Sequence, residues 1–233
     1  MAISRALMTR VAAGELADTL RISRPGASVA FGKRDAIAAG YPLAVAAARA
    51  EGYEAVERVA GGRASAFHDG TLHLGHSVAL ADPRAEVTGR FERTAALVAR
   101  ALRDLGIDAR VGEVDGEYCP GEHSVNARGQ VKLAGLGQRV IARGAHVGVV
   151  VVVDGADRVR EVLTPVYDAL DLGWRPDTAG SLADEDGAIG WERARAAIEA
   201  AYATEYDLEP AELDAETLEL AERLAPEHSS AGG

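Results

Sequence analysis

Apolar residues recur along the chain with two different periods, and these periods predict where helices and strands lie. Between residues 87 and 105 they return at steps of three and four, the pattern of a helix with one face against a core. Residues 19–23 alternate apolar and polar side chains, as a half-buried strand does. Residues 146–153 form an almost continuous apolar run, which is typical of a strand buried on both faces.

Turn-forming residues divide the rest of the chain into further elements of both kinds. The other strands that we expect are residues 28–31, 53–59, 71–80, 107–114, 131–134 and 138–142. The other helices that we expect are residues 4–13, 41–51, 154–163, 164–170, 191–204 and 208–224, with Asp214 as a cap in the last of these stretches. In this scheme residues 135–137 turn between two strands, Thr164-Pro165 starts a new helix, and residues 115–130 form a loop. Such a mixture predicts an α+β fold around a mixed, largely antiparallel sheet.

Composition limits the size and the environment of the protein. A chain of 233 residues, 48% of them hydrophobic, can bury one sizeable core but not two full domains. The net charge of −11 argues against a nucleic-acid partner, which requires a concentrated basic face. A single Cys fits a reducing cytoplasm, and no apolar run has the length of a signal peptide or a membrane span. We therefore expect a cytoplasmic protein with no membrane partner.

The stretch from residue 58 to residue 72 combines residue types that bind anionic groups. Gly61 and Gly62 allow the backbone to turn through conformations closed to other residues and to approach a ligand closely. Arg58 and Arg63 flank them, and a guanidinium offers a planar set of donors to a carboxylate or a phosphate. This glycine turn is the first candidate for a binding site.

Nearby histidines raise the question of a metal site. His73 and His76 fall on opposite faces of the expected strand, whereas zinc requires three or four convergent ligands. We therefore expect no metal. His68, followed by Asp69, is either a site residue or one member of a hydrogen-bonded turn.

Cys119 and Lys132 are the candidates for covalent chemistry. A nucleophilic Cys requires a lowered pKa, and His123, Arg128 and Lys132 are the nearby groups that could lower it. The alternative is that Cys119 is a small, half-buried apolar residue. Lys132, on an apolar strand, either extends outward to solvent or points into a site, and the glycines that follow it favour the second alternative.

Together these motifs resemble the lipoate–protein ligase and octanoyltransferase family, which shares its catalytic domain with biotin–protein ligases. Residues 58–69 resemble the family's Arg-x-x-Gly-Gly-(Gly/Arg)-Ala…His-Asp signature. Residues 132–138, Lys-Leu-Ala-Gly-Leu-Gly-Gln, resemble its lysine motif Lys-(Ile/Val/Leu)-x-Gly-x-Ala-Gln. Residues 29–32 resemble its early strand ending in glycine, and residues 105–110 its helix-to-strand crossing.

The chain also departs from the family pattern at three places. One extra residue stands between Gly62 and His68. Leu136-Gly137 replaces the Ser-Ala of the lysine motif, and His146-Val-Gly replaces the usual His-Gly. Because a slip of one residue exchanges the two faces of a strand, the first departure bears directly on His68.

The resemblance implies a class II synthetase-like catalytic domain over residues 1–180, a helical extension of the same domain over residues 181–228, and a disordered tail at 229–233. It implies an apolar slot for an octanoyl or lipoyl chain, with Lys132 at the carboxyl or acyl-phosphate end. The residues that it assigns to acyl or nucleotide binding are Arg58, Gly61, Gly62, Arg63, Ala64, His68, Gly135, Gly137, Gln138 and His146. The acceptor would be a lysine on a lipoyl-carrier domain of a 2-oxoacid dehydrogenase or on the glycine cleavage carrier protein.

Three functions fit this resemblance, and a fourth fits it less well. One group of octanoyltransferases forms a thioester on a Cys upstream of the motif lysine, takes its acyl group from acyl carrier protein and uses no cofactor. Cys119 occupies nearly that position, and Arg63 also favours the transferases, so we favour this reaction. The ligases instead use ATP and Mg²⁺ to make an acyl-adenylate from lipoate or octanoate. A third alternative is a non-catalytic binder that retains the pocket, and biotin ligation is a weaker fourth.

Overall fold

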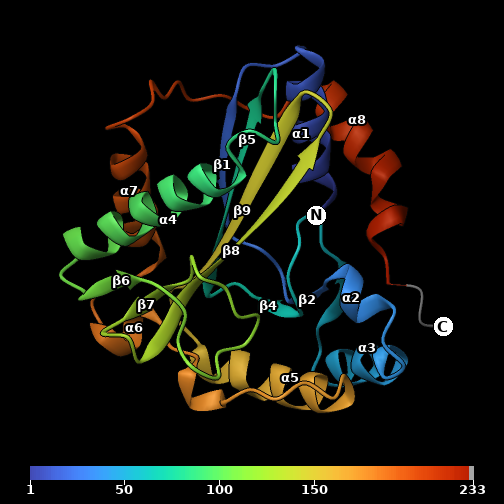
Figure 1. Ribbon diagram of the computed structural model, residues 1–233, viewed down its shortest axis with the longest axis vertical. Helices are drawn as coiled ribbons and strands as arrows, with labels where there is room; N and C mark the ends of the chain where they lie inside the picture. Colours follow the sequence, from blue (N-terminus) through green and yellow to red (C-terminus); the bar gives the residue numbers. More distant parts are fainter. Residues whose placement is uncertain (231–233) are drawn as a thin grey trace.

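The computed structural model describes residues 1–230, and Figure 1 shows a long central sheet with helices packed around it. Six strands form this sheet in the order β1-β5-β9-β8-β7-β6, and every neighbouring pair is antiparallel. They are β1 (Thr19–Ser23), β5 (Thr71–Ala79), β6 (Ala109–Val111), β7 (Val125–Ala127), β8 (Val131–Ile141) and β9 (Gly144–Val152).

A smaller sheet of three strands has the order β3-β2-β4. Its strands are β2 (Ser28–Phe31), β3 (Glu54–Glu57) and β4 (Ser65–Phe67). β2 runs parallel to β3 and antiparallel to β4. The expected α+β class with a mixed, largely antiparallel sheet arrangement is therefore confirmed.

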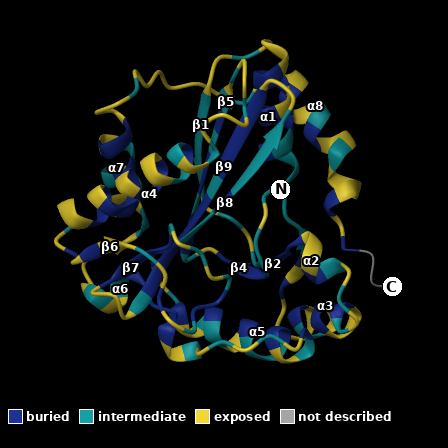
Figure 2. Ribbon diagram, viewed as in Figure 1, coloured by how far each residue is buried: buried dark blue, intermediate teal, exposed yellow. Residues whose placement is uncertain are grey.

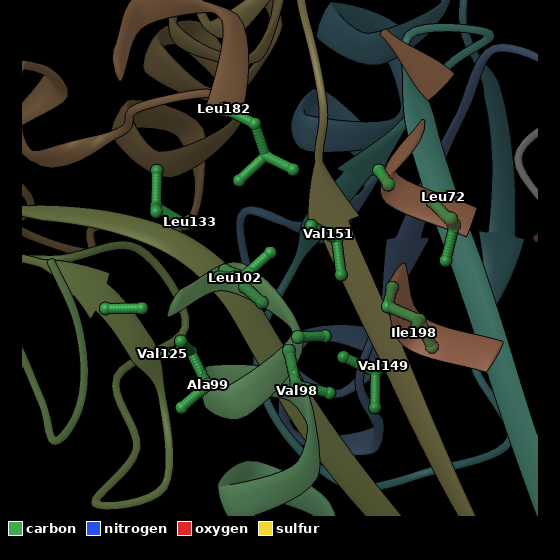
Figure 3. Close-up of a cluster of buried hydrophobic side chains, with 14 of the residues drawn as sticks. Leu72, Val98, Ala99, Leu102, Val125, Leu133, Val149, Val151, Leu182 and Ile198 are labelled. Atoms are coloured by element: carbon green, nitrogen blue, oxygen red, sulfur yellow. The ribbon is translucent and has the colours of Figure 1, made fainter. Parts of the chain in front are cut away.

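The main core lies between the large sheet and the helices α4 (Val87–Asp104) and α7 (Trp191–Tyr202). Val98 and Leu102 of α4 pack with Val149 and Val151 of β9, as Figure 3 shows. Val150, between these two valines, instead packs with Phe67 in a separate cluster. β9 is therefore buried on both faces, as its continuous apolar sequence predicts.

The other helices complete the fold. α1 (Ala2–Ala13) packs against β5 and β9, and α8 (Ala215–Leu224) packs on α1. A second core lies between the small sheet and the helices α3 (Tyr41–Ala50) and α5 (Ala156–Ala169). The short helices are α2 (Lys33–Ala36), α6 (Leu182–Glu185), and two 3₁₀ turns at Pro176–Thr178 and Ala225–His228.

The prediction of a turn at residues 135–137 was wrong, because β8 runs through them without a break. Gly135 pairs with Val150 and Gly137 pairs with Gly148 in the ladder to β9. These glycines provide space rather than a turn: a Cβ at Gly137 would lie 2.9 Å from Nη2 of Arg58, and one at Gly135 would lie 3.1 Å from Cε of Lys132. The two strands expected at 131–134 and 138–142 are one strand.

The prediction of a new helix at Thr164-Pro165 was also wrong. α5 begins at Ala156 and continues through Pro165 to Ala169. The hydroxyl of Thr164 donates to the carbonyl of Arg160 at 2.7 Å, and Val162, Leu163 and Val166 are buried against the second core. Tertiary packing therefore holds the helix together across a residue that cannot donate a backbone hydrogen bond.

Smaller differences concern the ends of elements. The loop expected over 115–130 contains β7, the strand expected over 107–114 is limited to Ala109–Val111, and the one over 53–59 to Glu54–Glu57. The helix expected over 208–224 is limited to Ala215–Leu224, because Asp214 caps α8 and accepts a hydrogen bond from the N–H of Thr217 at 2.8 Å. The expected cap is therefore confirmed, and the expected helix before it is wrong. Of the tail at 229–233, Ser229 pairs with Val56 and residues 231–233 lie outside the described residues.

Candidate active site

Cys119 lies in the loop of residues 112–124, which joins β6 to β7 and bends back toward the glycine turn. Its φ of 43° is left-handed backbone, which a non-glycine residue adopts only where its surroundings hold it. The N–H of Cys119 donates to the hydroxyl of Tyr167 at 2.7 Å, and this hydroxyl donates to the carbonyl of Ala64 at 3.0 Å. Tyr167, on α5, thus joins the Cys119 loop to the glycine turn.

Two nitrogen donors from the glycine turn point at the half-buried sulfur of Cys119. The N–H of Arg63 donates to Sγ at 3.2 Å, and Nη1 of Arg58 lies 3.5 Å from Sγ. Gly62, between these arginines, has φ 116°, and a Cβ there would lie 2.8 Å from Sγ. Only glycine permits this approach. The N–H of Gly61 donates to the carbonyl of Gln138 at 3.4 Å, which connects the turn to β8.

The side chain of Arg63 turns away from the sulfur. Its Nη1 donates to Oδ1 of Asp35 at 3.0 Å, and Oδ2 of this buried carboxylate accepts the N–H of Gly32 at 2.9 Å. A Cβ at Gly32 would lie 1.9 Å from the carbonyl oxygen of Gly62. α2 is therefore packed directly against the glycine turn, and Arg63 contacts the thiol through its backbone alone.

Lys132, on β8, lies beneath the Cys119 loop and is 1% exposed. Its ammonium donates to Oε1 of Glu117 at 2.9 Å, to the carbonyl of Tyr118 at 2.9 Å and to the carbonyl of Cys119 at 2.8 Å. These three bonds match the three donors of the ammonium. The alternative of an outward, solvated lysine is therefore wrong.

Glu117 is the residue of this loop that the sequence did not reveal. Its fully buried carboxylate accepts from Lys132, from the N–H groups of Val114 (3.1 Å) and Gly121 (3.2 Å), and from the hydroxyl of Ser124 (2.6 Å). In a polar stretch with three other carboxylates within five residues, nothing in the sequence distinguishes it. Tyr167 lies 48 residues from Cys119 on an otherwise ordinary helix, so it gave no signal either.

The charge around Cys119 favours the thiolate. Burial alone would raise the pKa of the thiol, but the positive charges of Arg58 and Lys132 and the N–H of Arg63 lower it below the ordinary value. Of the three groups expected to act in this way, only Lys132 does so. His123 stacks on Phe91 with ring centroids 5.2 Å apart, and Arg128 forms an ion pair with Glu185.

A narrow cavity, partly open to solvent, lies beside these residues. Arg58 and Gly135 line one part of it, His73 and His146 another, and its apolar walls include Phe67, Val149 and Val150. Burial holds the pKa of His73 at about 3 and that of His146 at about 4, so both rings are neutral near pH 7. Nδ1 of His146 lies 2.9 Å from the hydroxyl of Ser77.

The side chains of two predicted site residues, His68 and Gln138, do not line this cavity. Nδ1 of His68 accepts the N–H of Gly70 at 3.0 Å, and its ring packs near Gly155 at the far end of β4. The amide of Gln138 accepts from Nε of Arg90 at 2.7 Å and donates to the carbonyl of Val87 at 2.9 Å, so it ties β8 to α4. The other predicted residues, Arg58, Gly61, Gly62, Arg63, Ala64, Gly135, Gly137 and His146, lie around the thiol, Lys132 or the cavity.

Residues 1–230 have neither of two other features that a functional site could use. No three His, Cys, Asp or Glu side chains in this range are grouped so that they could hold a metal ion. None of the helices in this range has the length and apolar character needed to cross a membrane.

The family model of the lipoyl protein ligase A/B catalytic domain matches residues 1–170, and the chain belongs to this family. The resemblance seen in the sequence motifs is thereby confirmed.

The curated relatives are transferases by name. The chain is 29% identical over 140 residues to a lipoyl-[GcvH]:protein N-lipoyltransferase of Listeria monocytogenes, which covers 58% of this chain and 49% of the relative. It is 29% identical over 117 residues to an octanoyl-[GcvH]:protein N-octanoyltransferase of Oceanobacillus iheyensis, covering 50% and 41%. The matched regions thus span about half the length of these relatives.

Solved structures share the fold over almost the whole chain. A lipoate-protein ligase A bound with ATP superposes with a TM-score of 0.77 at 19% identity, covering 96% of this chain and 87% of that one. A bi-partite lipoate protein ligase from Thermoplasma acidophilum, described with its E2 lipoyl domain, has a TM-score of 0.75 at 18% identity, covering 96% and 86%. At these identities the likeness establishes the fold alone.

Proposed function

We propose that this protein transfers an octanoyl or lipoyl group to a lysine of a carrier domain through a thioester on Cys119. The observation that carries the proposal is the position of the thiol. Its sulfur lies beside the guanidinium of Arg58 and the N–H of Arg63, its loop is fastened to Lys132, and a largely apolar cavity adjoins it. The names of the curated relatives, both N-acyltransferases, support the same reaction.

The reaction has two acyl transfers. In the first, the Cys119 thiolate, whose proton has passed to solvent, attacks the acyl carbonyl of the donor. A carbon–sulfur bond forms, the bond from the acyl carbon to the donor's thiol sulfur or lysine nitrogen breaks, and the leaving group takes up a proton from solvent. In the second, the unprotonated amine of the acceptor lysine attacks the thioester, the amide forms, its surplus proton passes to solvent, and Cys119 leaves as the thiolate. Nη1 of Arg58 lies 3.5 Å from the sulfur, so its positive charge would stabilise the thiolate that attacks in the first step and leaves in the second.

The donor is either an octanoyl thioester of acyl carrier protein, as the resemblance of the motifs implies, or an acylated GcvH-type carrier, as the names of the relatives indicate. The acceptor is a lipoyl-carrier domain of a 2-oxoacid dehydrogenase or the glycine cleavage carrier protein. The acyl chain would lie in the cavity between Arg58 and the two neutral histidines, with Gly135 at its side.

The arrangement of Lys132 favours transfer over ATP-dependent ligation. All three donors of its ammonium are used within the Cys119 loop, so a lysine that bound an acyl-adenylate would first have to leave Glu117. Ligation with ATP and Mg²⁺ is the second candidate, supported by the fold shared with an ATP-bound ligase.

Intact mass spectrometry separates these candidates. Incubation with octanoyl-acyl carrier protein, and in parallel with an octanoylated GcvH-type carrier, should add one octanoyl mass to the wild type and none to Cys119→Ala. An adduct of equal yield in Cys119→Ala would disprove the thioester. Pyrophosphate release from ATP and lipoate that is lost in Lys132→Ala but kept in Cys119→Ala would establish the ligase. Lipoate binding without either reaction would favour the non-catalytic binder.

A further inference from the structure

One exposed surface beside the candidate site carries basic side chains and no exposed acidic ones. Between Asp18 and Glu51 the chain has a single acidic residue, Asp35, although it has 36 in total. Asp35 is fully buried and paired with Arg63. The exposed charge of α2 is therefore entirely basic, on a protein whose formal net charge is −11.

This basic surface also exposes two large apolar side chains. α2 turns Asp35 inward and leaves Lys33, Arg34 and Ile37 exposed; Ile37 follows its last turn and is 86% exposed. Leu43, in the first turn of α3, is 69% exposed. We name Lys33, Arg34, Ile37 and Leu43 the α2–α3 surface, and the exposed parts of these two helices are visible at the right of Figure 2.

The surface adjoins the thiol through a short series of direct contacts. Gly32, immediately before α2, packs on the carbonyl of Gly62, and Asp35 holds the guanidinium of Arg63. The N–H of Arg63 in turn donates to Sγ of Cys119. α2 is therefore separated from the sulfur by a single layer of backbone, and a protein seated on it would be close to the acyl group.

Building on the proposed transfer reaction, we propose that the α2–α3 surface docks the acceptor carrier domain. The occupant is an acidic carrier with an apolar spot near its target lysine, because Lys33 and Arg34 provide positive charge and Ile37 and Leu43 provide apolar contact. Opposite charges at the rim of an interface raise the association rate and make it depend on salt, while buried apolar residues slow dissociation.

The test isolates the second acyl transfer. Octanoyl-enzyme is prepared for each variant, and its decay is followed by intact mass against increasing concentrations of the unmodified glycine cleavage carrier protein. In the double variant Lys33→Glu/Arg34→Glu, and in Ile37→Asp, the second-order rate constant should fall about tenfold or more. Added salt should slow the wild type but have a smaller effect on the double variant. Cleavage of each octanoyl-enzyme by hydroxylamine, which needs no docking, should be unchanged.

Matched controls lie on α8, away from the site. Arg223→Glu and Leu218→Asp make the same kinds of change at exposed positions and should leave the rate constant unaltered. Equal rates in wild type and α2–α3 variants would overturn the docking proposal. So would a wild-type dimer that Ile37→Asp dissociates without altering carrier acylation, because the surface would then serve self-association.

The outcome also separates this proposal from the proposed function. If the wild type forms no octanoyl-enzyme, the proposed transfer reaction is wrong. A calorimetric titration of unmodified carrier into the wild type and into Lys33→Glu/Arg34→Glu then still tests whether the α2–α3 surface binds the carrier. Weaker binding by the double variant supports it, and equal binding, or none in either protein, overturns it.

Discussion

Two charge networks of this protein look alike in their bonds and differ in their surroundings. Arg10 joins α1 to α8 through Asp214 (2.5 Å) and Glu216 (2.6 Å), and these carboxylates are 46% and 79% exposed. Lys132 joins β8 to the Cys119 loop through Glu117, where both side chains are almost completely buried. Water can replace a lost partner in the first network, but not in the second.

The difference indicates what each network contributes. An ion pair whose partners are exposed is screened by water and contributes little to stability. A buried pair gives little net stability over apolar residues, yet it is costly to break, because the remaining charge stays uncompensated. The Lys132–Glu117 pair therefore fixes geometry: it holds the loop that carries Cys119, whereas the Arg10 network fastens two helices.

The largest expected effect is that of Lys132→Met. This change leaves the Glu117 carboxylate buried without its cation, which costs about 3–5 kcal/mol of unfolding free energy. It also removes one of the charges that lower the pKa of Cys119. Chemical denaturation should show the loss of stability, and octanoyl-enzyme formation should fall below detection. Wild-type stability in this variant would mean that water already reaches Glu117.

Glu117→Gln should have a smaller effect. It removes the counter-charge of Lys132, but the amide oxygen and the carbonyls of Tyr118 and Cys119 still accept the three donors of the ammonium. The amide nitrogen would replace the oxygen that accepts the N–H of Val114, so two donors would face each other at a cost of about 1–3 kcal/mol. The loop should loosen, and formation of the thioester should slow more than the stability loss alone explains. Thermal melting measures the stability of the protein, and the rate of Cys119 alkylation in quenched samples measures the reactivity of the thiol. Glu122→Gln, at an exposed position of the same loop, is the matched control.

Arg58→Met tests the electrostatics without breaking the buried pair. Since Arg58 is the first of the groups that lower the thiol pKa against the effect of burial, its removal should raise that pKa. The pH at which iodoacetamide alkylation reaches half its maximal rate should therefore move upward relative to wild type. An unchanged alkylation profile would assign the lowered pKa to Lys132 and the N–H of Arg63 instead.

The smallest expected effect is that of Asp214→Asn in the exposed network. Hydrogen bonds from Thr217, then Arg10, lower the pKa of Asp214 to about 2 from an ordinary value of 3.8. Because the pKa of this carboxyl is lower in the folded than in the unfolded chain, its charge stabilises the folded protein above pH 3.8. This stabilisation is lost as the pH falls from 3.8 towards 2. Asn still caps α8, so the variant should lose only this charge-dependent part. Its melting temperature should lie slightly below that of the wild type at pH 7, and the two should converge near pH 2. Acyl transfer should be unaffected.

Local sequence predicted much of the fold and part of the candidate site. The period of residues 87–105 predicted α4, the apolar run at 146–153 predicted the doubly buried β9, and Asp214 predicted the start of α8. The glycines at 135 and 137 were misinterpreted, because their local meaning, a turn, and their tertiary meaning, space beside Arg58 and Lys132, are identical in sequence. Pro165 was misinterpreted for the same reason, since the packing of α5 outweighs a missing hydrogen bond.

By itself the sequence determined most of the elements, the fold class, the family, and the presence of one thiol and one lysine in motifs of the right order. Only the tertiary structure decided which groups surround the thiol. It brought Arg58 rather than His123 or Arg128 to the sulfur, placed Glu117 and Tyr167 as the fastenings of the loop, and turned His68 and Gln138 to other contacts. The physical reason is that periodicity and turn residues act over a few positions, whereas desolvation and charge act between segments that only folding brings together.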